Sequence, residues 1–166
     1  MLRKNVFRLI AALCISGAAP VAKAEGGKFG DWSLQTSGKG DAKSCYIASE
    51  VKEPGDGPGV RSVSAIYISA WPKDGIKSEV SIKLGYAAKP DGGAKASVGK
   101  ETFSLFIKDE HAFVADPTME LKLVEAMKKG SKLVIEATAG DGAPVKDGYS
   151  LLGISQAMAA QAQACP

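Results

Sequence analysis

The chain has 166 residues, of which 45% are hydrophobic and 23% are charged, a composition typical of one globular domain. Its formal net charge is +3, but the first 24 residues contain four of the 21 basic residues and no acidic one. Residues 25–166 therefore carry 17 basic and 18 acidic side chains, a net charge of −1. This balance argues against nucleic-acid binding by a basic face.

The N-terminal segment has the pattern of a secretory signal peptide. Basic residues precede an apolar run at 9–19, and small residues at Ala22 and Ala24 predict cleavage after Ala24. The run is too short for a permanent membrane-spanning helix. We therefore expect residues 25–166 to be periplasmic or secreted from a Gram-negative bacterium, with no integral membrane span.

Alternation of apolar and polar residues predicts a series of β-strands. The run at 62–71, apolar or small on both faces, is typical of a central strand. The Asp109–Glu110 turn predicts a hairpin between its two neighbours. The predicted strands span 30–36, 44–51, 62–71, 79–86, 102–108, 111–116 and 131–138, and mobile Gly/Pro/Asp-rich turns are expected at 53–59, 88–93 and 139–148.

Two helices interrupt the strand pattern. For the first, Asp116 is a predicted N-cap, Pro117 suits the first helical position, and Gly130 is placed where a left-handed C-terminal cap is expected. The first helix has an apolar stripe of Met119, Leu123, Val124 and Met127. The second helix, at 154–164, has a stripe of Ile154, Met158, Ala162 and Cys165.

These elements predict a mainly β fold. We expect an antiparallel β-sandwich over residues 25–166, with one helix between strands and a C-terminal helix. No internal repeat or interdomain linker is evident, so one domain follows the 1–24 signal peptide.

Cys45 and Cys165 are the two cysteines of the predicted exported chain, and an even count in an oxidising compartment favours one disulfide. Both are expected to face the same interface, and the bridge would close a loop of about 120 residues, worth about 5 kcal/mol in the chain-entropy picture. The alternative is a buried free thiol at Cys45 with Cys165 pairing between molecules. A lipid-modified Cys14 is a further alternative, although Leu13 occupies the position where lipoprotein signals have a small residue.

The residues specify no reaction. His111 stands without companion ligands, so we expect no metal and no cofactor. Ser97 and Lys100 match an S-x-x-K pattern, but a glycine and flanking strand-like segments argue against the helix that a serine acyltransferase needs. Trp32 is expected in the core, whereas Trp71, at a strand end before a proline, is a candidate for a partly exposed binding surface.

Several segments in a fixed order resemble the invasion-associated locus B proteins of Gram-negative bacteria. The resembling segments are FGDW at 29–32, SCYIAS at 44–49, AWP at 70–72, EVSIKLGY at 79–86, LVEAMKKGSKLVIEAT at 123–138 and YSLLGISQAMAAQAQAC at 149–165. Many members have a further cysteine soon after the Gly-Asp-Trp motif and another pair in mid-chain. This chain has Leu34, Gln35 and Thr36 near the first position and none in mid-chain, so only the Cys45–Cys165 pair is carried over.

The resemblance implies an exported, mainly β-sandwich envelope protein without established catalytic residues. We therefore expect a non-enzymatic binding or interaction module, with host-cell association as a candidate virulence role and an envelope or host protein as partner. Two alternatives remain. One is an envelope hydrolase using Ser97 and Lys100, and the other is a carrier of a small lipid or glycan inside the sandwich.

Overall fold

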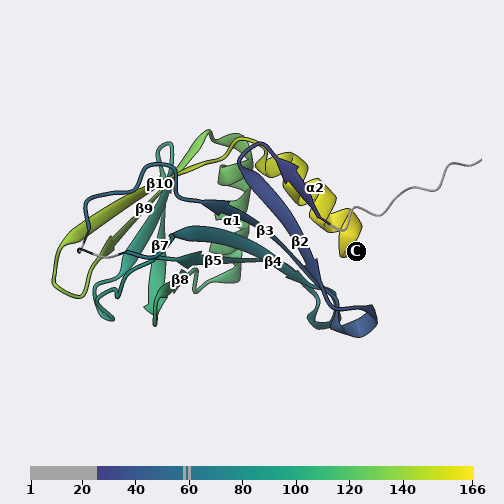
Figure 1. Cartoon of the computed structure of the whole chain (residues 1–166), viewed down its shortest axis with the longest axis horizontal. Helices are drawn as coiled ribbons and strands as arrows, with labels where there is room; N and C mark the ends of the chain where they lie inside the picture. Colours follow the sequence, from purple (N-terminus) through teal and green to yellow (C-terminus); the bar gives the residue numbers. More distant parts are fainter. Residues whose placement is uncertain (1–25, 58, 60) are drawn as a thin grey trace, which may run out of the picture.

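The computed structural model describes residues 26–57, 59 and 61–166, and these form ten strands and two α-helices (Figure 1). The predicted signal peptide and Cys14 lie outside the described residues. The elements are β1 Gly27–Phe29, β2 Trp32–Ser37, β3 Ser44–Glu50, β4 Ala65–Trp71, β5 Ile76–Lys83, β6 Ala94–Val98, β7 Glu101–Lys108, β8 His111–Phe113, α1 Pro117–Lys129, β9 Lys132–Thr138, β10 Pro144–Ser150 and α2 Ile154–Ala164, with 3-10 turns at Gly40–Ala42 and Pro72–Asp74.

All the strand pairs are antiparallel, which confirms the predicted fold class. The order across the sheet is β1-β2-β3-β4-β5-β8-β7-β6-β9-β10, so the two layers expected of a sandwich belong to one continuous sheet. The sheet bends back on itself. This is shown by a bridge between Glu53, just after β3, and Gly148 of the distant edge strand β10. The bend is what lets both halves share one core.

One face of the sheet is buried under the helices. Alternate residues of β2 to β5 are fully buried, as the period-2 pattern predicts, and they join one core with apolar residues of α1 and α2. Figure 1 shows α2 running beside β1 and β2, while α1 lies behind the middle of the sheet. The helices therefore cover the inner face, and the outer face of β3 and β4 keeps partly exposed side chains such as Tyr46 and Tyr67.

Three strands were not predicted. The 139–148 segment was expected to be a mobile turn, but its second half, from Pro144, belongs to β10, which pairs with β9 over seven residue pairs. Buried and exposed positions alternate along this strand, with Val145, Asp147 and Tyr149 facing inward. The Gly, Pro and Asp residues of the segment are typical of turns, so the sequence does not reveal this alternation. The strands β1 and β6 are short or rich in small residues, so their sequence signal is weak.

The first helix begins as predicted but ends differently. The Asp116 carboxylate accepts a hydrogen bond from the Met119 backbone N–H at 2.9 Å, which is a standard N-cap. Gly130 is extended, with φ −86° and ψ 174°, so the predicted left-handed cap is wrong. The glycine is needed for space instead, because a Cβ there would lie 2.4 Å from the Val98 side chain of β6.

The second helix is rotated from the predicted orientation. Its fully buried positions are Ile154, Ala157 and Gln161, whereas Met158 is partly exposed and Ala162 is exposed. The predicted apolar stripe is therefore only partly a core-facing stripe. The glutamine buried in its place could not be anticipated from an alanine-rich sequence, because hydrophobic patterning assigns polar residues to the solvent face.

Candidate binding groove

The predicted disulfide pair lies where the C-terminal helix meets the sheet. Cys45 on β3 and Cys165, just after α2, are joined with an S–S distance of 2.06 Å and a Cα–Cα distance of 6.1 Å. Both residues are buried. Lys43 supports the same junction, since its Nζ donates a hydrogen bond to the Ala164 carbonyl at 2.6 Å. The end of α2 is therefore fixed to the sheet at two adjacent points.

Beside this junction lies a groove of about 640 Å³, between α1, α2 and the β4–β5 connection. Apolar side chains from three separate elements make its walls. Leu121 of α1 is 59% exposed and Ile76 of β5 is 37% exposed, although both are large hydrophobic residues. The apolar side chains and sulfur that line the groove include Ile76, Leu121, Val124, Met158, Ala162 and Cys165. Three members of the predicted α2 stripe thus face this groove.

Gln161 supplies a polar group to the groove. Its side-chain Nε2 donates hydrogen bonds to the carbonyls of Cys45 at 3.1 Å and Ile68 at 2.8 Å, tying α2 to both β3 and β4. Only 2% of the residue is exposed, yet it belongs to the groove lining. Sequence reasoning missed this residue because nothing marks one glutamine among three in the same helix.

The placement of α1 depends on Glu120. Its Oε1 accepts a hydrogen bond from the Val80 backbone N–H at 2.8 Å. This N–H has no partner in β8, because β8 pairs with β5 only from Ser81 to Lys83. Burial is the main cause that raises the pKa of Glu120 above its ordinary value, although the Val80 hydrogen bond opposes it. This contact sets one wall of the groove against β5.

Trp71 lies next to the groove but not in its lining. It is 39% exposed, as the sequence suggests, and its chain neighbours Ala70 and Pro72 both line the groove. Its backbone is paired with Ile76 across the β4–β5 connection. Trp32 is fully buried in the core, and its indole N–H donates to the Ser150 carbonyl at 3.1 Å.

Ser97 lies near the end of β6, Lys100 lies in the two-residue turn between β6 and β7, and both line one open depression. The Ser97 hydroxyl lies 3.2 Å from the Thr102 hydroxyl. Within residues 26–57, 59 and 61–166, no hydrogen bond joins Ser97 to Lys100. The one-turn helical geometry of a serine–lysine pair is therefore not formed, because both residues lie on a hairpin.

His111 begins β8 and is partly exposed, with its ring 6.1 Å from that of Phe113. In the part of the chain that the structure describes, no cluster of three or more His, Cys, Asp or Glu side chains is placed to hold a metal ion. No helix among these residues has the length and apolar character needed to span a membrane.

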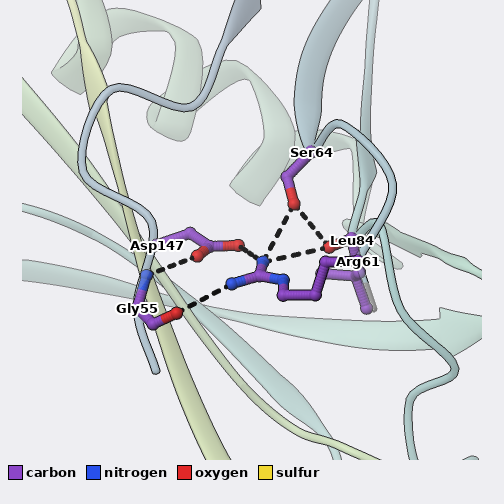
Figure 2. Close-up of polar contacts among 5 residues, drawn as sticks. All are labelled: Gly55, Arg61, Ser64, Leu84 and Asp147. Carbon is purple, nitrogen blue, oxygen red and sulfur yellow. Dashed lines mark hydrogen bonds and ion pairs between the residues drawn. The ribbon is translucent and has the colours of Figure 1, made fainter. Parts of the chain in front are cut away.

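A buried charged pair fixes the loop between β3 and β4 (Figure 2). The Arg61 guanidinium donates to the Asp147 carboxylate of β10 at 2.6 Å and to the Gly55 carbonyl at 2.9 Å. Asp147 also accepts from the Gly55 backbone N–H at 3.0 Å, and the Ser64 hydroxyl donates to the Leu84 carbonyl at 2.6 Å. The loop is therefore tied to the far edge strand and closes the bend of the sheet.

Tyr86 and Tyr149 surround this pair. The Arg61 guanidinium carbon lies 4.8 Å from the Tyr86 ring centroid, within cation–π range. Burial, with a contribution from the Asp147 charge, raises the pKa of Tyr86 to about 12 and raises the pKa of Tyr149 above its usual range. Both phenols are therefore neutral at physiological pH. These contacts stabilise the fold, and none of the residues that make them lines the groove.

A model of the family described as "Invasion associated locus B (IalB) protein" matches residues 32–162. The chain belongs to the invasion-associated locus B family. The match begins at Trp32 and ends at Ala162. Among curated proteins, none matches the chain.

The family's fold is also seen in a solved relative. The chain is similar to the crystal structure of invasion associated protein B from Bartonella henselae, with a TM-score of 0.60 and 17% sequence identity. The similarity covers 82% of this chain and 94% of that one. The resemblance expected from the sequence is therefore confirmed at the level of family and fold.

Proposed function

We propose that this invasion-associated locus B protein is a non-enzymatic, exported envelope protein that acts by binding, and that the groove between α1, α2 and the β4–β5 connection is its binding surface. The observation that carries the proposal is the exposure of Leu121 and Ile76 on the walls of a concave surface. Soluble proteins seldom expose gathered apolar side chains without a use for them. The binding partner is a component of the bacterial envelope or of a host cell, the second in keeping with the name of the Bartonella relative.

Export is part of this proposal. A disulfide between residues 120 positions apart is stable in an oxidising compartment, and the sequence of residues 1–24 has the pattern that would send the chain there. The domain would then comprise residues 25–166. N-terminal sequencing of the protein purified from the envelope should begin at Glu25, and its intact mass should be two hydrogens below that of the reduced chain. A retained N-terminus or two free thiols would contradict export in this form.

The binding role is tested by a matched pair of variants. Leu121→Lys places a charge in the groove, whereas Leu152→Lys changes a leucine that is 67% exposed outside the groove lining. We expect tagged wild type and L152K to retain the same envelope components, identified by mass spectrometry, and L121K to lose them. Equal retention by L121K would contradict the assignment of the groove.

A hydrolase is the second candidate, because Ser97 and Lys100 line the same depression. A covalent serine probe distinguishes it from the binding role. We expect no labelling of the wild type. Labelling of the wild type that is lost in Ser97→Ala would support the hydrolase and contradict a purely binding role.

A further inference from the structure

The geometry points to a single-chain lipid with an uncharged, hydroxyl-bearing head, such as a monoacylglycerol, as the ligand of the groove; this inference rests on the proposed binding function. Three properties of the groove lead to it. They are its size, the unused acceptor of Gln161 and the charges of its lining.

The size and lining suit a small apolar molecule. Sites for small ligands have volumes of about 300–1,000 Å³ and are mainly apolar with a few placed polar groups. The groove, at about 640 Å³, falls within that range, and Leu121, Ile76 and Met158 provide apolar walls from three elements. An extended peptide would need backbone partners along its length, because each of its residues brings a donor and an acceptor. Walls made mainly of apolar side chains favour an acyl chain instead.

Gln161 gives the groove one hydrogen-bond acceptor. Both hydrogens of its Nε2 are used by the Cys45 and Ile68 carbonyls, which fixes the orientation of the amide. Among the residues that the structure describes, none donates a hydrogen bond to Gln161 Oε1. This oxygen keeps some exposure to solvent. Because the residue is 98% buried and lines the groove, we place this free acceptor toward the groove. A ligand hydroxyl placed there would satisfy it.

The charges of the lining favour an uncharged head. The side chains that line the groove include one cation, Lys77, and one anion, Glu125. Glu125 is also paired with Lys128 at 2.7 Å on the exposed face of α1. Opposite charges at one site give no net attraction for a head that carries a single charge, and Glu125, already paired with Lys128, offers little to the cation of a zwitterionic head. A neutral molecule with a donor near its head and one apolar chain therefore fits the groove best, and such molecules arise from both bacterial and host lipids.

The test uses the fluorescent apolar probe N-phenyl-1-naphthylamine on the exported protein, with monolauroylglycerol and methyl laurate as competitors. The two competitors share an acyl chain, but only monolauroylglycerol has hydroxyl donors. We expect monolauroylglycerol to displace the probe about tenfold more effectively, because methyl laurate leaves the Gln161 acceptor unsatisfied. L121K should bind probe and lipid at least about tenfold more weakly than wild type, and L152K should match wild type. Circular dichroism of both variants verifies folding.

The outcomes separate this inference from the proposed function. Failure of monolauroylglycerol to displace the probe, equal displacement by methyl laurate, or equal binding by L121K and L152K would overturn the lipid assignment. If envelope components were still retained through Leu121 in the pull-down, the binding role would stand and only the ligand class would be wrong. Native mass spectrometry of protein purified from cells would show a bound lipid, and monolauroylglycerol should release it. The chemical identity of the released lipid would show whether its natural source is bacterial or host.

Discussion

Single side chains decide where this bent sheet closes. Arg61 and Asp147 are 86 positions apart in sequence, yet they form a largely buried ion pair at 2.6 Å. Replacing a buried charged pair with apolar residues can be neutral, but removing one member leaves the other charge buried without compensation. Loss of either residue alone is therefore expected to lower the free energy of unfolding more than replacement of both residues together.

Arg61→Ala is expected to lower the free energy of unfolding by about 3–5 kcal/mol, because the Asp147 carboxylate would remain buried. Chemical denaturation measures the change. Lys128→Ala is the control, since it breaks an exposed ion pair with Glu125 and should cost at most about 1 kcal/mol. A similar loss in both variants would show that the Arg61 pair is not effectively buried.

Glu120 predicts a pH dependence. Burial raises its pKa in the folded state above the unfolded value, so the folded state binds the proton more tightly. The contribution of Glu120 to the free energy of unfolding is therefore largest below the unfolded pKa and falls as pH rises through the interval up to the folded pKa. Glu120→Gln keeps an oxygen for the Val80 N–H and removes the charge.

We expect Glu120→Gln to raise Tm at about pH 7, and the gain to shrink toward zero at about pH 3.5, where the wild-type carboxyl is protonated. Thermal melts at both pH values measure it. Glu125→Gln is the control, because Lys128 lowers the pKa of that exposed carboxyl, and it should not raise Tm. A lower Tm of Glu120→Gln at neutral pH would contradict the prediction.

At the scale of elements, the sequence predicted the strands with a strong period-2 pattern. Val80, Ile82, Leu84 and Tyr86 face inward as expected, and so do Leu133, Ile135 and Ala137 of β9. The prediction from sequence failed where a contact with a residue distant in the chain determines the local structure. Asp147 is buried because Arg61 reaches it, and position 130 requires a glycine because a Cβ there would lie 2.4 Å from the Val98 side chain. Neither distant partner can be found from the local residues.

The groove was predictable only in part for the same reason. The sequence identified Cys45, Cys165 and the apolar residues of both helices, and it marked Trp71 as partly exposed. It assigned Met158 and Ala162 to the core, because periodicity defines an apolar stripe without saying whether a sheet or a groove receives it. Gln161 carries no local signal. Its importance comes from the carbonyls of β3 and β4 that it meets in the folded protein.

The disulfide predicts how α2 responds to reduction. Cys45→Ala/Cys165→Ala is expected to lose about 2–5 kcal/mol of unfolding free energy, since the bridge closes a loop of 120 residues. Amide hydrogen exchange should rise first in α2, which loses its covalent anchor. Reduction of the wild type should give the same change, and reducing agent should leave the double variant unaffected. Unchanged stability would mean that noncovalent contacts alone hold the helix.

At the scale of the whole molecule, one bent sheet buries its inner face under two helices, and the groove lies between these helices and the β4–β5 connection. The disulfide, Gln161 and Glu120 each hold one wall of that groove. The core therefore supports a surface whose exposed apolar residues have no role in the core itself. We propose that this exposed apolar surface is where the protein binds its partner.

The most direct measurement is an NMR titration of isotope-labelled exported protein with monolauroylglycerol. We predict chemical-shift changes concentrated on α1, α2 and the β4–β5 connection, with the Gln161 side-chain amide among the largest. L152K should reproduce this pattern, and L121K should lose it. The absence of shifts, or shifts centred on the outer face around Tyr46 and Tyr67, would contradict the groove as the binding site.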